Sequence, residues 1–328
     1  MEPTWRPAAG SSASLIHELS LTMYVGCTVI FLLVMALLLY AVFSRPRPVR
    51  ARLWLAVGGL AFPVTVLVAL LGYSVAVGNT LNNFQGQGVL RFLLDCVSDA
   101  SRALGLSTTD AAAIRVEVKA RQWWWEVRYR IGAEEFELAN ELRLPAGRAV
   151  ELELVTEDVI HSFWVPSLAG KVDMIPGHRN RLVLKADEPG VHGGVCAEYC
   201  GGQHALMGLV VVVETEDGFQ RWRERQARDA PAPGDDFLAQ GRSAFMRGGC
   251  GDCHAVRGTE ARGDLGPDLT HVGSRHSLAA GVLTNHVGTM AGWIAGGQAL
   301  KPGNAMPDAR DYDGQELRAV AAWLESLR

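Results

Sequence analysis

The sequence predicts a multidomain fold class: a transmembrane two-helix hairpin, then an all-β domain, then an all-α domain. Three observations predict it. Two long apolar runs without charged residues precede residue 79. From residue 114 apolar and polar residues alternate, as they do in half-buried strands. After residue 236 the pattern becomes helical around a short motif with two cysteines.

Length and charge set the first limits on function. A chain of 328 residues can hold two modest domains beside membrane segments. The formal net charge is only -4, so the chain has no basic surface of the kind that nucleic-acid binding requires. We therefore expect membrane lipid, and no nucleic acid, among its partners.

The two apolar runs are Leu21–Phe43 and Leu53–Val77. Each reaches the ~20 residues that a helix needs to cross the hydrocarbon layer. A cleaved signal peptide is the alternative for the first run, but the run is too long for one, and Glu2 and Glu18 precede it. We expect an outer segment over residues 1–20 and a helix hairpin over 21–78.

The short connection between the runs indicates their direction. It holds Arg45, Arg47, Arg50 and Arg52, and such an excess of arginine marks the cytoplasmic side. Both termini and everything after about Gly78 are then expected on the periplasmic side of a bacterial inner membrane. Residues 79–112 are expected to connect the hairpin to the β domain and to include one amphipathic helix.

Residues 113–216 show the strand pattern. Short alternating segments begin at Ile114, Val150 and Arg181, and a continuous apolar strand begins at Gly208. Proline-glycine turns separate them, which predicts a sandwich or barrel. The charged and then proline-rich residues 217–236 are expected to form a linker, followed by a helical domain over 237–328.

One loop of the β domain offers soft metal ligands. It contains Cys196, Cys200, His204 and Met207. The two cysteines could form a disulfide or bind zinc together with the histidine, but a thioether suits copper rather than zinc. A second thiolate would allow two metal ions to share both sulfurs. His161, at the start of a strand-like segment, is the candidate for a further imidazole.

The C-terminal domain contains Cys250-Gly-Asp-Cys253-His254, the attachment signature of c-type haem. A redox dithiol is the alternative, but it does not require the histidine. Met306 is the expected ligand on the other face of the iron and would raise the haem potential, whereas Met290 is expected to pack in the core. Helices are expected over Phe237–Arg247 and Gln315–Leu327.

The metal-ligand loop resembles the copper loop of cytochrome oxidase subunit II, Cys-x-Glu-x-Cys-Gly-x-x-His-x-x-Met. The matching residues are Cys196, Glu198, Cys200, Gly201, His204 and Met207. Three further segments resemble motifs of the same family: Gln122–Trp125, His161–Pro166 and Gly170–Gly177. Gly266–Thr270 and Lys301–Pro307 resemble segments of cytochrome c domains fused to that subunit. The resemblance covers nearly the whole chain.

The resemblance implies a cupredoxin-like Greek-key domain with a binuclear copper (CuA) centre, followed by a cytochrome c domain with haem c. The implied copper ligands are the side chains of His161, Cys196, Cys200, His204 and Met207 and the backbone oxygen of Glu198. The Glu198 carboxylate would bind a magnesium ion shared with subunit I, as a hard cation prefers. Trp123 matches the tryptophan through which electrons enter, while Trp124 and Trp125 are expected to pack.

The implied function is that of subunit II of a haem-copper terminal oxidase. It would pass electrons from haem c through CuA to subunit I, which reduces oxygen to water with proton translocation. The implied partners are subunit I, subunit III and a donor such as a quinol-cytochrome c reductase or a small cytochrome c. Two readings stay open: a CuA-containing nitric oxide reductase, because Arg50–Trp54 lacks the acid that oxidases often carry there, and a membrane-tethered carrier without a catalytic partner. His178 also replaces the usual arginine after Pro-Gly.

Overall fold

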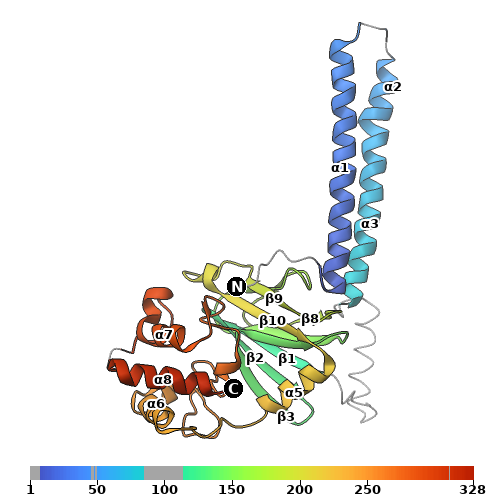
Figure 1. Ribbon diagram of the computed structural model, residues 1–328. Coiled ribbons are helices and arrows are strands. Elements are labelled where there is room, and N and C mark those ends of the chain that lie inside the picture. Colours follow the sequence, from blue (N-terminus) through green and yellow to red (C-terminus); the bar gives the residue numbers. More distant parts are fainter. Residues whose placement is uncertain (1–7, 46–47, 49, 85–113, 310) are drawn as a thin grey trace. The chain divides into compact units, whose positions relative to one another are not determined.

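The computed structural model describes residues 8–45, 48, 50–84, 114–309 and 311–328. It divides into a helical unit, Ser12–Ser107, and a second unit made of Met1–Ser11 and Thr108–Arg328. The amphipathic helix expected near Val89 lies outside the described residues. Figure 1 shows the two units, and each is described below by itself.

The helical unit contains two long apolar helices. The first is α1 (Ser11–Phe43); the second runs through α2 (Ala51–Ala56), a π-helical turn η1 (Val57–Ala61) and α3 (Phe62–Phe84). Both are long and apolar enough to cross a membrane, and their large apolar side chains lie exposed. These features fit membrane anchoring, as expected.

The π-helical turn lies directly before Pro63. Proline has no N–H and its ring crowds the preceding turn of a helix. In the structure the Phe62 N–H donates to the carbonyl oxygen of Val57, five residues back. This wider turn takes up the irregularity and lets the helix continue.

The β domain consists of two five-stranded sheets, as the strand pattern predicted (Figure 1). The first sheet has the order β3-β2-β1-β5-β8. Its strands are β1 (Arg115–Arg121), β2 (Trp124–Ile131), β3 (Glu134–Ala139), β5 (Val150–Thr156) and β8 (Asn180–Leu184). β1 and β5 pair in parallel, and the other neighbours are antiparallel.

The second sheet has the order β4-β10-β9-β6-β7 and carries the metal-ligand loop. Its strands are β4 (Glu141–Pro145), β6 (His161–Trp164), β7 (Val172–Met174), β9 (Gly190–Cys196) and β10 (Gly208–Glu214). Alternate side chains of both sheets form one core, in which Trp125, Leu152, Phe163 and Val211 are fully buried.

The expected linker differs from the observed structure in its first half. Residues 216–226 form helix α5 (Glu216–Gln226), whose Phe219 and Trp222 are buried against the β domain. The Trp222 ring makes an edge contact with Tyr129. The many charged residues of α5 give no sign of this packing in the sequence. The irregular connection is therefore confined to residues 227–235.

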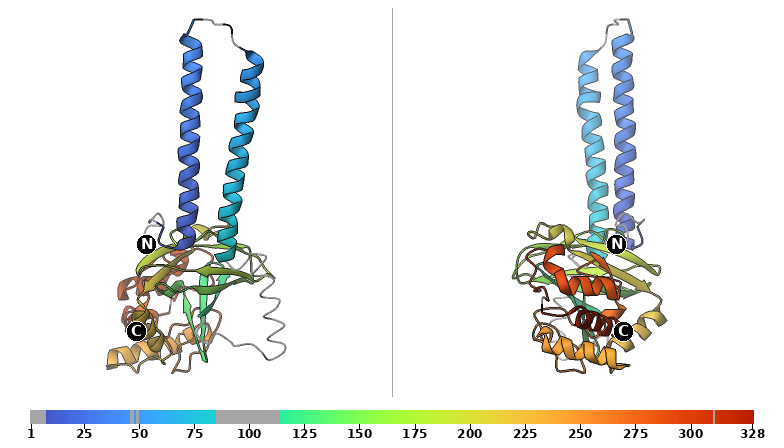
Figure 2. Two further views of the ribbon diagram at one scale, coloured as in Figure 1. Left: turned by 90° about the vertical axis from the view of Figure 1, so that its right-hand side faces the viewer. Right: turned by 60° about the vertical axis from the view of Figure 1, so that its left-hand side comes forward.

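The C-terminal domain is built from α6 (Asp236–Arg247), α7 (Val287–Leu300) and α8 (Gly314–Ser326), which Figure 2 shows in two views. α6 and α8 cross closely at Gly241, which has no side chain. A Cβ added there would lie 2.0 Å from the Ala319 oxygen. The helices α6 and α8 match the expected ones within two residues at each end. α7 was not predicted.

Candidate metal centre and haem-attachment site

The second sheet positions the metal-ligand loop. Cys196 is the last residue of β9, and its strand neighbour β6 begins at His161. The Cys196 N–H donates to the Met207 oxygen at 3.0 Å, which closes the loop at the start of β10. Three adjacent strands thus bring residues that are distant in sequence together at one end of these strands.

The five predicted ligand side chains form one cluster. The Cys196 and Cys200 sulfurs lie 3.7 Å apart, and both cysteines are free. The Nδ1 atom of His161 lies 3.7 Å from the Cys196 sulfur, and that of His204 lies 3.6 Å from the Cys200 sulfur. The Met207 sulfur is 3.9 Å from the Cys200 sulfur. His161, Cys196, Cys200 and Met207 are buried.

The donor set fits copper. A disulfide requires a sulfur–sulfur distance of about 2.05 Å, far shorter than observed here. Two thiolates, two imidazoles and a thioether are soft or intermediate ligands of the kind that copper prefers. The thioether of Met207 is 1% exposed and faces the thiols rather than merely filling the core.

Glu198 contributes its two ends differently. Its backbone oxygen lies 3.3 Å from the Cys196 sulfur, within the cluster. Its carboxylate points outward, is 45% exposed and lies 3.6 Å from the Lys171 ammonium. An ion bound by the Glu198 carboxylate would therefore lie beside the Lys171 ammonium, which already pairs with that carboxylate.

Asp158 is a site residue that sequence reasoning missed. Its Oδ1 lies 2.8 Å from Nε2 of His161, which leaves Nδ1 of that ring facing the thiols. The Gln122 N–H donates to its other oxygen at 2.7 Å. Burial opposes ionisation of Asp158, but these hydrogen bonds outweigh it and lower its pKa to about 2. A carboxylate that orients a ligand histidine is a common feature of metal sites.

The contact between the two thiols shifts their pKa values in opposite directions. The hydrogen bond between the sulfurs, 3.7 Å apart, acts with His161 and against the effect of burial to hold the pKa of Cys196 far below its usual range. The same contact, together with burial, raises the pKa of Cys200.

Trp123 lies directly beside the cluster. Its ring N–H donates to the Cys200 backbone oxygen at 2.9 Å, and the Gln122 side chain donates to the same oxygen at 2.8 Å. Trp125, by contrast, is fully buried and packs edge-on against Phe163. Of these two tryptophans, Trp123 hydrogen-bonds a predicted ligand residue, whereas Trp125 only packs near the His161 ring, at a centroid distance of 6.4 Å.

The haem motif lies in a tight turn after α6. The His254 N–H donates to the Cys250 oxygen at 3.0 Å. Nδ1 of His254 lies 2.8 Å from the Pro267 oxygen, so Nε2 is the nitrogen left to bind iron. Burial lowers the pKa of His254, which favours the neutral form that a metal needs. A Cβ at Gly266 would lie 2.6 Å from this ring, so glycine is required there.

Met306 is held by its backbone. Its N–H donates to the Asn304 side-chain oxygen at 2.8 Å, and the Gln298 side chain donates to its carbonyl oxygen at 2.7 Å. Its side chain is half-buried and, like that of Cys250, packs against the hydrophobic core of the domain. Met290 is 2% exposed in the same core, where packing explains it. Met306 therefore has a fixed backbone and a side chain near the surface of the domain.

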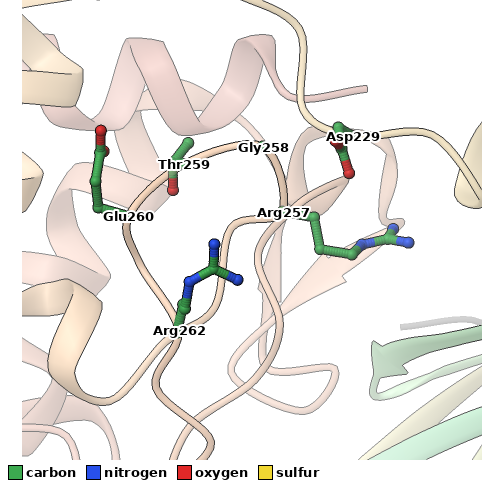
Figure 3. A pocket seen from close by; sticks show the side chains of 6 residues that line it. All are labelled: Asp229, Arg257, Gly258, Thr259, Glu260 and Arg262. Atoms are coloured by element: carbon green, nitrogen blue, oxygen red, sulfur yellow. The ribbon is translucent and has the colours of Figure 1, made fainter.

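A polar depression lies elsewhere, between the connection and the haem domain. Figure 3 shows the residues that line it: Asp229, Arg257, Gly258, Thr259, Glu260 and Arg262. Arg257 already donates to the Gln226 oxygen at 2.6 Å, and its own oxygen accepts from Ala230 at 3.0 Å. These contacts attach the connection to the haem domain and include none of the predicted ligands.

Comparison with known proteins assigns both domains to families. Residues 130–214 match the family model for the periplasmic domain of cytochrome c oxidase subunit II, and residues 238–328 match the cytochrome c model. Cytochrome c oxidase subunit 2 of Alkalihalophilus pseudofirmus is 39% identical over 215 residues, covering 66% of this chain and 61% of that protein. The same subunit of Bacillus sp. PS3 is 30% identical over 240 residues, covering 69% and 66%.

The matches thus extend over somewhat less than two thirds of the length of these curated relatives. A solved structure, the periplasmic domain of cytochrome oxidase subunit II of Bradyrhizobium japonicum, is 28% identical and covers 35% of this chain and 94% of that domain, with a TM-score of 0.34.

Proposed function

Since the chain belongs to the cytochrome c oxidase subunit II family and ends in a cytochrome c domain, we propose that it is the electron-transfer subunit of a haem-copper terminal oxidase. The observation that carries the proposal is the ligand cluster. Two free thiols, two imidazoles and a thioether face one another with neighbouring donor atoms 3.6–3.9 Å apart. This arrangement favours a pair of copper ions that share the two sulfurs.

We assign the cofactors as follows. The copper pair and haem c supply reversible one-electron chemistry when bound. The copper ligands are the side chains of His161, Cys196, Cys200, His204 and Met207 and the backbone oxygen of Glu198. The haem is attached at Cys250 and Cys253, with His254 and Met306 as axial ligands. The Glu198 carboxylate, exposed and beside Lys171, is assigned to a magnesium ion that a partner subunit helps to bind.

The chain's own residues then have distinct roles. Asp158 orients the His161 ring through Nε2, and the buried Met207 keeps water from the thiols. Trp123 connects the outer surface to the backbone of Cys200 and is the point where electrons enter. His254 is kept neutral and oriented by the Pro267 oxygen.

The proposed partners follow from the exposed groups. Tyr199 in the copper loop is 75% exposed, Trp164 at the end of β6 is 37% exposed, and Ile175, directly after β7, is 38% exposed. Apolar side chains of this size beside a metal loop fit a docking surface for subunit I. Subunit III and a donor, either a quinol-cytochrome c reductase or a small cytochrome c, complete the proposed assembly. The two apolar helices would anchor it in the inner membrane, with both termini and both redox domains in the periplasm.

Purification of the native complex tests this proposal. We expect two copper atoms and one covalent haem per chain, a co-purifying haem-copper subunit, and oxygen consumption. A complex whose chain lacks Cys196 should consume no oxygen. Consumption of nitric oxide in place of oxygen would assign the chain to a reductase. Isolation of the chain without any catalytic partner would make it a tethered carrier. Either result would overturn the oxidase assignment.

A further inference from the structure

Lys301 has a buried ammonium between the β domain and the haem domain. It follows the last residue of α7 and is 3% exposed. Its Nζ donates to the backbone oxygens of Trp123 at 2.8 Å, Leu206 at 3.0 Å and Ala279 at 3.3 Å. The first two oxygens belong to the β domain, one at the tryptophan beside the cluster and one in the copper loop. Lysine is almost never fully buried unless its charge is satisfied.

The arrangement uses every donor of the side chain. An ammonium has three N–H groups, and three carbonyl oxygens receive them. Burial lowers the pKa of Lys301 to about 8, so burying this group is costly. A lysine that simply capped α7 would bond the last carbonyls of that helix. The ammonium of Lys301 instead bonds segments outside α7.

Further contacts surround the lysine. The Gln203 side chain of the copper loop donates to the Pro302 oxygen at 2.8 Å. The Gly208 N–H donates to the Ala280 oxygen at 2.9 Å, and a Cβ at Gly208 would lie within 2.9 Å of that oxygen. The buried Glu141 accepts from the His276 N–H at 2.7 Å. These bonds fix the haem domain on the β domain in one orientation.

The same short loop carries the lysine and the proposed haem ligand. Lys301 bonds the Trp123 carbonyl, and the Trp123 ring bonds the Cys200 carbonyl. A Cβ at Gly303, between Lys301 and Met306, would lie 4.0 Å from the Trp123 ring. The loop that holds one metal centre is thus in contact with the tryptophan that borders the other.

We propose that Lys301 is a positioning residue that docks the Met306 loop onto Trp123 and the copper loop. Electrons would then pass from haem to copper within one docked arrangement. A domain on a flexible tether would instead depend on repeated encounters at an effective concentration in the millimolar range. The inference rests on the proposed function, since it concerns the same two centres.

The test uses the full chain in its native complex. Lys301→Met removes the ammonium but keeps the length of the side chain. We expect haem-to-copper electron transfer, followed by stopped-flow absorption without oxygen, to slow by about 10-fold or more and to become sensitive to solvent viscosity, because a buried hydrogen-bonded charge is lost. Hydrogen exchange should rise in the peptides covering residues 122–125 and 300–306.

Lys185→Met is the matched control, because it removes an exposed ammonium that pairs with Asp187. The proposal is overturned if Lys301→Met transfers electrons within about twofold of this control, or if exchange in those two peptides does not change. If Lys301→Met fails to fold, Gln203→Ala cuts a neighbouring docking bond and is judged by the same two measurements. If the wild type lacks the copper or haem spectra, the proposed function itself is contradicted. This outcome distinguishes failure of the proposed function from failure of the docking role of Lys301.

Discussion

The copper loop and the haem motif are built in different ways. The proposed copper ligands range from His161 to Met207, and the register of β6, β9 and β10 brings them together. The haem motif is contiguous, and its two thiols are placed by a single turn after α6. The β domain thus shapes its site through its own buried core, whereas the haem domain is proposed to receive a covalently attached group.

The largest expected effect is the loss of copper from the copper loop. Cys200→Ser should abolish the copper-dependent absorption and leave the covalent haem unchanged, because one shared sulfur is lost while the β core stays intact. Copper and haem content of the purified complex measure this. Normal copper in the variant would show that the second thiol is not a ligand.

The next largest effect concerns the haem domain. The double change Cys250→Ala and Cys253→Ala should leave the copper signal but lower the thermal stability of the haem domain, because the domain would lose a covalently attached apolar group. Differential scanning calorimetry, compared with a chelator-treated wild type, measures it. We expect copper removal to shift the β domain much less. An equal or larger shift of the β domain would contradict the comparison.

A third prediction concerns the iron. Met306→Leu should lower the haem potential in a redox titration, because a thioether opposite histidine raises it. Met290→Leu is the control: it should leave the potential unchanged and cost less than about 1.5 kcal/mol of unfolding free energy, as volume-conserving swaps in a core do. If Met290→Leu moved the potential and Met306→Leu did not, the ligand assignment would be reversed.

The smallest effect concerns Asp158. Asp158→Asn should weaken copper binding by about 10-fold to 100-fold, as the loss of a carboxylate behind a ligand histidine does. Competition with a chelator measures the affinity. Asp173→Asn is a suitable control, because that exposed carboxylate pairs with the Lys171 ammonium rather than with a ligand histidine. Equal affinity in both variants would remove Asp158 from the site.

The sequence predicted the parts whose signal is local. The copper loop and the haem motif are short patterns of reactive residues, and β1, β5, β8 and β10 follow from alternation and apolar runs. Their side chains need only the strand period to be placed on a face. For this reason the sequence alone could predict which side chains gather in the ligand cluster.

The remaining parts depend on contacts between distant residues. α7 contains Gly288, Gly292, Gly296 and Gly297, and Gly296 is non-helical, so local propensity argues against this helix. Helix α5 was taken for linker, because its charged residues outnumber the two aromatics that it buries. The Asp158–His161 pair and the partners of Lys301 arise only when the loops are folded.

The most direct test of the account counts thiols and copper in the same sample. The matured wild-type protein is denatured with a chelator and an alkylating reagent but without reductant, and its copper is measured before denaturation. We predict two copper atoms per chain and alkylation of both Cys196 and Cys200. A copper-free protein in which these two cysteines resist alkylation until reductant is added would contradict the shared-sulfur centre.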